Sequence, residues 1–156
     1  MIKKFKQKIN SIIIIFLFSF AVKANADESL KLAIENDARG EKNQSRDLHR
    51  NPYETLSFFE IDKQKKILEV VPGRGWYTEI LSNYMDGSNN LFVLMYGKPR
   101  IEILKKIQKN FKNKFSDKNN PFGQVNEVYF SGELDIQFEK NFFDIVLTFR
   151  NSHNWL

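Results

Sequence analysis

The sequence predicts an α/β fold built on a mainly parallel sheet, and two patterns indicate it. First, apolar runs suited to buried strands alternate with amphipathic helices along residues 67–149. Second, the apolar run ILEVV at 67–71 passes through the glycine turn PGRG at 72–75 directly into a helix. Ligands bind at the carboxyl ends of the strands in such sheets. The sequence therefore places a ligand site at the glycine turn.

The predicted elements follow from hydrophobic periodicity and from the breaks between periodic segments. The polar stretch 39–50 shows neither the helical nor the strand spacing of apolar residues and is expected to be a loop. The last strand is strongly apolar, and the connection before it runs through 134–141. Helices are predicted at 28–38, 52–59, 76–85 and 100–115, and strands at 67–71, 91–96, 125–130 and 142–149.

The second predicted helix has a recognisable start. Asn51 is expected to cap it, and Pro52 takes the first helical position. Glu54 can reach back to the cap, as in a capping box. The apolar side of this helix is expected to consist of Leu56, Phe58 and Phe59.

The first 26 residues have the pattern of a secretory signal peptide. A lysine-rich beginning precedes an apolar run at 12–22, and Ala24-Asn25-Ala26 is an A-x-A cleavage signal. An uncleaved membrane anchor is the alternative, but the apolar run is shorter than the roughly 17 to 25 residues that span a bilayer. We therefore predict cleavage after Ala26, a secreted or periplasmic protein that meets the membrane only during export, and one domain at 27–156.

Charge and composition exclude several classes of function. Five of the 24 Lys and Arg residues lie in the leader, which has no acid, so the remaining 19 equal the 19 Asp and Glu residues. A neutral chain gives no reason to expect nucleic acid as a partner. The absence of cysteine excludes disulfides and thiol chemistry. The two histidines are far apart and lack H-x-x-x-H spacing, so no metal site is expected.

The glycine turn distinguishes between nucleotide-binding motifs. A dinucleotide fingerprint needs a third glycine where Thr78 stands, and an acid after the second strand, where Tyr96 and Gly97 stand. A phosphate-binding P-loop needs G-K-[ST], which does not follow here. A nicotinamide enzyme is therefore disfavoured and a P-loop enzyme is excluded.

The segment from Glu69 to Gly75 instead resembles the first motif of class I, Rossmann-like, S-adenosylmethionine-dependent methyltransferases. That motif runs acid-x-Gly-x-Gly-x-Gly, and Val71 stands in place of its first glycine. Together with RDLHRNPYETLSFF at 46–59, PGRGWYTEIL at 72–81 and FFDIVLTFRNSHNW at 142–155, most of the mature chain resembles a family of exported, predicted methyltransferases. The resemblance implies S-adenosylmethionine as cofactor and an unknown small-molecule or envelope substrate.

The resemblance also implies a set of cofactor-binding residues around the turn. Gly73 and Gly75 would line the methionine and ribose part of the cofactor, and Glu69 would orient the turn through its backbone or a water. Asp144 starts the fourth strand and is expected to be structural. The full set expected to bind the cofactor is Glu69, Pro72, Gly73, Gly75, Trp76, Tyr96 and Arg150.

The segment after the fourth strand faces the substrate in methyltransferases, which makes it the candidate catalytic segment. His153 can take a proton from a nucleophile, and Asn151 or Asn154 can orient that nucleophile. The same residues can equally cap a helix and fill the underside of the loop. Methyl transfer needs mainly in-line positioning of the acceptor, so it does not depend on an obvious base.

A charged run at 46–50 precedes the first strand, and two interpretations of it remain open. It can fold over the cofactor site as a lid, with Arg50 meeting a carboxylate. It can also be a solvated loop, which is the commoner role of such runs and the interpretation we favour.

Rossmann-like methyltransferase sheets continue beyond the fourth strand, whereas this sequence ends soon after it. We therefore expect only the first four strands, in the order 3-2-1-4 with flanking helices, as in a C-terminally truncated member of the family. The strand at 142–149 would then be an open apolar edge through which the chain can self-associate. The alternative function is that of a non-catalytic ligand-binding protein or a degenerate fragment that keeps the Rossmann-like fold.

Overall fold

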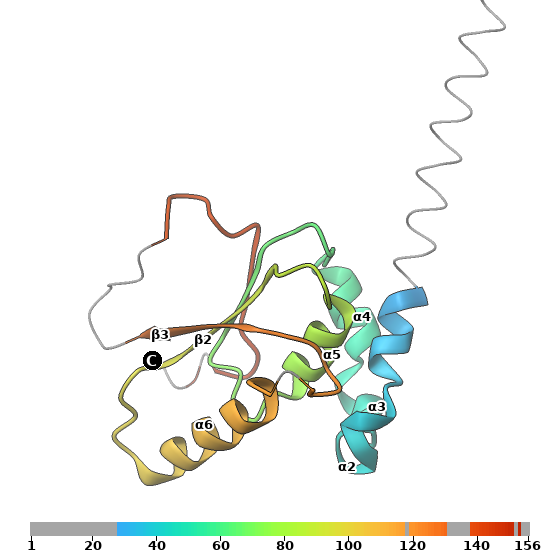
Figure 1. Ribbon diagram of the computed structural model, residues 1–156. Helices are drawn as coiled ribbons and strands as arrows, with labels where there is room; N and C mark the ends of the chain where they lie inside the picture. The colour runs from blue at the N-terminus through green and yellow to red at the C-terminus, as the bar shows by residue number, and fades with distance from the viewer. Residues whose placement is uncertain (1–27, 118, 131–137, 152, 154–156) are drawn as a thin grey trace, which may run out of the picture.

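The computed structural model describes residues 28–117, 119–130, 138–151 and 153. It is an α/β structure whose four strands form one parallel sheet in the order β3-β2-β1-β4 (Figure 1). The predicted α/β class, parallel sheet and strand order are therefore confirmed. The predicted signal peptide at 1–26 lies outside the described residues. The strands are β1 (Ile67–Val70), β2 (Leu91–Tyr96), β3 (Asn126–Phe130) and β4 (Ile145–Leu147).

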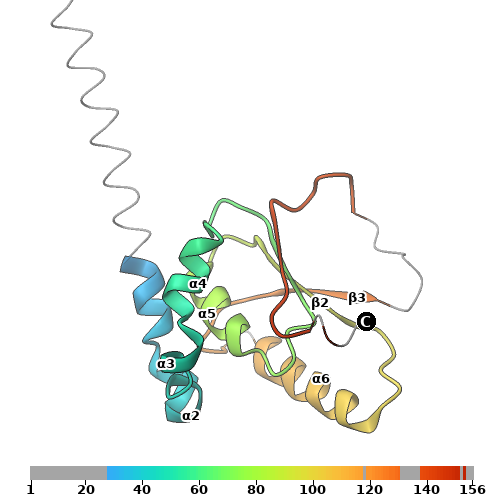
Figure 2. The same ribbon diagram turned by 180° about the vertical axis from the view of Figure 1, so that it is seen from behind.

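The helices precede β1 or connect the first three strands. None of those in the described ranges is long and apolar enough to cross a membrane. In Figures 1 and 2 they gather on one side of the sheet, and the chain leading into β4 runs on the other. In chain order they are a helix at 28–34, η1 (Asp37–Arg39), α2 (Gly40–Gln44), α3 (Asp47–Arg50), α4 (Pro52–Phe58), α5 (Trp76–Tyr84) and α6 (Glu102–Phe115).

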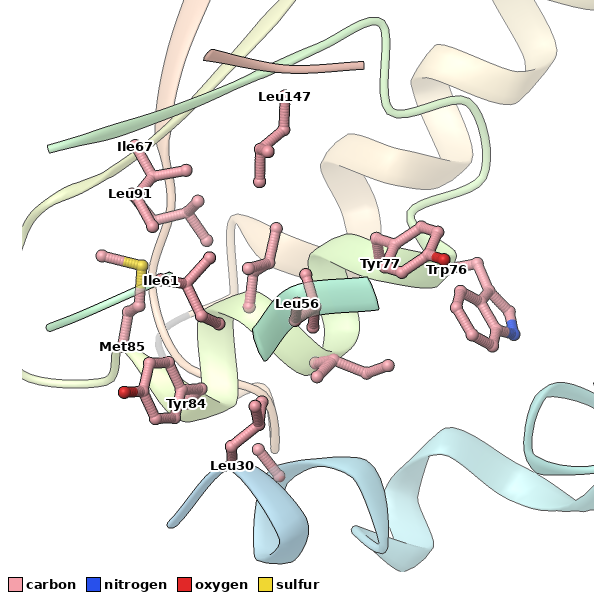
Figure 3. Close-up of a cluster of buried hydrophobic side chains, with 13 residues drawn as sticks. Leu30, Leu56, Ile61, Ile67, Trp76, Tyr77, Tyr84, Met85, Leu91 and Leu147 are labelled. Carbon is pink, nitrogen blue, oxygen red and sulfur yellow. The ribbon is translucent and has the colours of Figure 1, made fainter. Parts of the chain in front are cut away.

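Strand register decides which side chains face the helices. Glu69 pairs with Val93 and with Leu147, and all three are buried on the helix side of the sheet. The larger buried cluster joins this side to α4, α5 and the helix at 28–34. Figure 3 shows Leu147 and the neighbouring sheet residues directed toward Leu56 and α5. A second cluster lies under α6 and comprises Val93, Met95, Phe111, Phe115 and Phe122.

The opposite side of the sheet is covered by aromatic side chains from the chain before β4. The ring of Phe92 lies 5.5 Å from Phe142 and 5.3 Å from Phe143, measured between centroids. Lys66 donates its N–H to the Asp144 carboxylate at 2.8 Å and accepts the Asp144 N–H at 2.9 Å. Asp144 thus has the structural role that was expected.

The predicted strand at 142–149 was too long, because only Ile145–Leu147 pairs with β1. Its first two residues, Phe142 and Phe143, pack against the Phe92 ring instead of pairing with β1. β4 nevertheless forms an edge of the described sheet, and Val146 is 60% exposed there. Self-association through this edge stays a prediction.

The prediction of a loop at 39–50 was wrong, because these residues form η1, α2 and α3. Arg39 is buried and donates to both carboxylate oxygens of Asp47, at 2.8 and 2.7 Å. Its Nε lies 3.6 Å from the buried Glu79 carboxylate of α5, which Lys114 of α6 also contacts. The contact of Arg39 with Glu79 thus links to α5 a stretch that has no apolar periodicity of its own.

The predicted helix start at Asn51 is correct only in part. Pro52 does occupy the first turn of α4. Asn51, however, makes no side-chain capping bond, because it is left-handed (φ 43°) and its N–H closes α3 by donating to Asp47 O at 2.8 Å. The apolar side is also smaller than predicted, since Leu56 is fully buried whereas Phe58 is 81% exposed and Phe59 is 40% exposed.

Candidate functional site

The glycine turn joins the end of β1 to the start of α5, and its backbone is held at both ends. The Val71 N–H donates to Leu94 O of β2 at 2.8 Å, and the Gly75 N–H donates to Pro72 O at 3.0 Å. Val71, which immediately precedes the turn, and both glycines of the turn are left-handed, with φ of 52° at Val71, 62° at Gly73 and 78° at Gly75. A β-branched residue rarely adopts this conformation, so Val71 is strained where the methyltransferase motif has glycine.

The two glycines of the turn face different surroundings. Gly73 is exposed, and a Cβ added to it would meet no atom within 4 Å. A Cβ on the buried Gly75 would lie 2.7 Å from Phe115 Cε2 and 3.1 Å from Phe111 Cε2. The structure therefore places Gly73 on the open side of the turn and Gly75 behind it, against α6.

One hollow lies between the turn and α6, and we call it the apolar hollow. Its volume is about 450 Å³, within the roughly 300–1,000 Å³ of small-molecule sites. Gln108 donates its side-chain N–H to Tyr96 O at 2.7 Å, which fixes the end of β2 at its rim. Its lining includes the turn residues 71–73, Tyr96, Ile103, Leu104, Ile107 and Gln108.

A second hollow of about 200 Å³ lies against the same turn residues, and we call it the arginine hollow. Its aromatic wall is rigid, because the Tyr77 and Phe149 rings stack at 3.7 Å and the Trp76 indole donates to Asn43 O at 3.0 Å. Arg50 lies over the Trp76 ring, 4.5 Å from its centroid. Four arginines line this hollow: Arg46, Arg50, Arg74 and Arg150.

Burial shifts the pKa values of two side chains that line the arginine hollow. Burial lowers the pKa of Arg50, and the neighbouring positive charges of Arg46 and Arg150 lower it further. Burial raises the pKa of Glu69 to about 7, against the effect of the hydrogen bond that Thr78 Oγ1 donates to it at 2.6 Å. Glu69 was expected to act through its backbone or a water. In the structure its side chain is held by this hydroxyl.

The candidate catalytic residues lie in different settings. Asn151 lines both hollows, and its amide donates to Val71 O at 2.9 Å and to Thr148 Oγ1 at 3.2 Å. It thereby ties the segment after β4 to the glycine turn. His153 is exposed and lines neither hollow, and Asn154 lies outside the described residues.

Most of the predicted cofactor-binding residues are brought together by the fold. Pro72 and Gly73 line both hollows, Tyr96 lines the apolar hollow, and Gly75 lines neither. Arg74 was not predicted to belong to the site, and a solvated loop was the favoured prediction for the run that contains Arg46. The sequence signal for these two arginines is that each segment that meets at the turn carries an arginine: Arg46 and Arg50 bound the run at 46–50, Arg74 lies in the turn, and Arg150 follows the last strand. The remaining predicted residues, Glu69, Trp76 and Arg150, line the arginine hollow.

Within the described part of the chain, no group of three or more His, Asp or Glu side chains gathers in a way that could hold a metal ion. Comparisons with protein-family models, with curated proteins and with solved structures find no match for this chain. The function is therefore argued from the two hollows and the turn between them.

Proposed function

We propose that the apolar hollow and the glycine turn bind S-adenosylmethionine, and that the protein methylates a small-molecule or envelope acceptor outside the cytoplasm. The observation that carries this proposal is a hollow of about 450 Å³ beside the bare backbone of Gly73, at the carboxyl ends of β1 and β2. Ligands of parallel α/β sheets bind at this edge. The resemblance of the turn to the first methyltransferase motif supports the same cofactor.

The residues of the apolar hollow suit an adenosine group. Ile103, Leu104 and Ile107 of α6 offer apolar surface to a flat base. Among the described residues, no carboxylate lines the hollow. The ribose hydroxyls therefore need an acceptor other than the usual acidic side chain. The amide oxygen of Gln108 is an acceptor for such a hydroxyl, because the amide N–H of the same side chain is already bonded to Tyr96 O.

The chain's contribution to methyl transfer is positioning. When bound, the cofactor supplies an electrophilic methyl group, and transfer requires the acceptor to lie in line with it. Asn151 ties the segment after β4 to the turn through Val71 O, and so holds the two walls of the site at a set distance. His153 as the proton acceptor stays a prediction.

Calorimetric titration of the full chain with S-adenosylmethionine and S-adenosylhomocysteine tests this proposal. We expect saturable micromolar binding of both. Gly73→Leu directs a side chain into the hollows and should weaken binding at least tenfold. Gly87→Leu is a matched control, because Gly87 also has a positive φ (76°), has no atom within 4 Å of an added Cβ and lines neither hollow. Equal affinity of the two variants would refute the assignment of the turn.

A non-catalytic ligand-binding protein is the second candidate. Two observations favour it: Tyr96 stands where β2 of a methyltransferase is followed by an acid, and the Asn151 amide is engaged with the backbone of the turn. Incubation with methyl-labelled S-adenosylmethionine, envelope extract and small-molecule pools separates the two. Transfer of label supports the enzyme, and saturable cofactor binding without transfer supports the binding protein.

A further inference from the structure

The arginine hollow concentrates positive charge from three separated parts of the chain. Arg46 precedes α3 and Arg50 is its last residue, Arg74 belongs to the glycine turn, and Arg150 follows β4. Within the described ranges, none of these four guanidinium groups forms an ion pair. The buried Arg39 differs, because Asp47 and Glu79 neutralise it. Among the described residues, these four cations therefore have no carboxylate paired with them.

The acidic groups near the hollow do not balance this charge. Asp47 is engaged with Arg39 through both of its carboxylate oxygens. Glu69 lines the hollow but is fully buried, and burial raises the pKa of its carboxyl group to about 7. Its negative charge is therefore incomplete near neutral pH. Like charges held together without compensation are unfavourable, and a bound anion relieves that repulsion.

We propose that the arginine hollow binds a phosphate monoester group. At neutral pH such a group carries a charge of about −1.5 to −2 and presents three strong acceptor oxygens, whereas a carboxylate carries a single charge. Guanidinium groups match phosphate oxygens with paired N–H donors. This proposal does not depend on S-adenosylmethionine binding in the apolar hollow.

The size of the arginine hollow supports a phosphate head group rather than a whole ligand. Its volume of about 200 Å³ falls below the roughly 300–1,000 Å³ of complete small-molecule sites. It meets the apolar hollow at residues 71–73, so the rest of a phosphorylated molecule can extend along the turn. The ligand class that fits the arginine hollow is a small organic phosphate.

The walls of the arginine hollow are already in place. The Arg50 guanidinium lies 4.5 Å from the centroid of the buried Trp76 ring, and the Trp76 indole is bonded to Asn43 O. The stacked rings of Tyr77 and Phe149 connect the segment that carries Arg150 to α5. Groups that are ordered before binding lose little conformational freedom when an anion arrives. We therefore expect phosphate binding by the free protein.

Titration of the full chain with inorganic phosphate, glycerol 3-phosphate and acetate tests the proposal, at about pH 7.5, constant ionic strength and without S-adenosylmethionine. We expect calorimetry to show saturable binding of both phosphates at concentrations where acetate gives no signal. Equal responses to acetate and phosphate would overturn the proposal. Because the cofactor is absent, the outcome is independent of whether the proposed methyltransferase function holds.

Single Arg→Gln variants locate the bound phosphate. Arg74→Gln and Arg150→Gln change exposed side chains and should each weaken phosphate binding about tenfold through the loss of paired N–H donors. Arg100→Gln removes the same charge from an exposed residue that lines neither hollow, and should change affinity less than twofold. Affinity in the first two variants equal to that of Arg100→Gln would contradict the location.

A further arm distinguishes a soluble phosphate from a lipid head group. The protein is sedimented with phosphatidylcholine vesicles that contain or lack phosphatidic acid. Cosedimentation that requires phosphatidic acid and is displaced by glycerol 3-phosphate assigns the site to a lipid. Binding of glycerol 3-phosphate without cosedimentation assigns it to a soluble monoester. If the protein neither binds glycerol 3-phosphate nor cosediments with the vesicles that contain phosphatidic acid, the proposal is contradicted.

Discussion

The two sides of the glycine turn show how one sequence pattern serves two physical purposes. On the buried side, Gly75 lets Phe111 and Phe115 of α6 pack against the backbone, with no room for a Cβ. On the open side, Gly73 has a similar left-handed φ, yet it faces the two hollows and would accept a side chain without a clash. A glycine motif therefore identifies a turn, and packing decides which glycine serves the ligand.

The same contrast holds for the residues around the glycine turn. Glu69 and Thr78 are buried and bonded to each other at 2.6 Å, so their polar groups serve the interior. Val71 and Asn151 line both hollows and are joined by a hydrogen bond of 2.9 Å. Changes on the buried side should act mainly on stability, and changes on the open side mainly on binding.

The largest expected effect is that of Gly75→Ala. The added methyl group meets Phe115 at 2.7 Å in a left-handed backbone, so overpacking and strain together should lower the free energy of unfolding by about 4 kcal/mol. Gly73→Ala has the same backbone penalty without the contact and should cost about 1 kcal/mol. Urea unfolding measures both. Equal losses would show that the packing difference between the two glycines has no energetic consequence.

The next effect is a pH dependence that Glu69 causes. Its pKa rises from 4.5 to about 7 on folding, so the native protein binds the proton more tightly than the unfolded chain. Its stabilising contribution is therefore complete below about pH 4.5 and is lost as the pH rises through 7, by roughly 3 kcal/mol in total.

Glu69→Gln should remove this decline, because an amide cannot ionise and its oxygen can still accept from Thr78 Oγ1. The measurement is the free energy of unfolding at several pH values between 4.5 and 8. Glu54→Gln, an exposed change on α4, is the control that should follow the wild-type curve. If the stability of Glu69→Gln declines by the same amount as the pH rises, titratable groups other than Glu69 cause the decline.

The smallest effect is a gain of stability in Val71→Gly. Glycine relieves the left-handed strain at φ 52°, and this outweighs its greater freedom in the unfolded chain, so we expect a gain of about 1 kcal/mol. Val70→Gly is the matched control one residue earlier in β1, where φ is not left-handed. It should instead lose about 2 kcal/mol of stability. Thermal unfolding of the pair decides, and a loss in both would show that Val71 is not strained.

Several parts of the fold could be predicted because their signals are local. The bounds of β2, 91–96, were predicted correctly from one apolar run between two breaks. The strand, turn and helix around Gly73 were predicted from an apolar run followed by glycines. The helices at 40–50 were missed because the contacts that hold them in place are polar, such as those of Arg39 with Asp47 and with the distant Glu79. Such pairing leaves no periodic trace in the sequence.

The sequence by itself determined the order of the elements and the place of the turn, because strand periodicity and the left-handed preference of glycine act over a few neighbouring residues. Only the tertiary structure decided that Gly75 packs against α6 while Gly73 stays open. It also decided that Arg46, Arg50, Arg74 and Arg150, which are far apart in the sequence, line one hollow. The physical reason is that side-chain contacts and unpaired charges depend on distances in space, which local residue preferences do not contain.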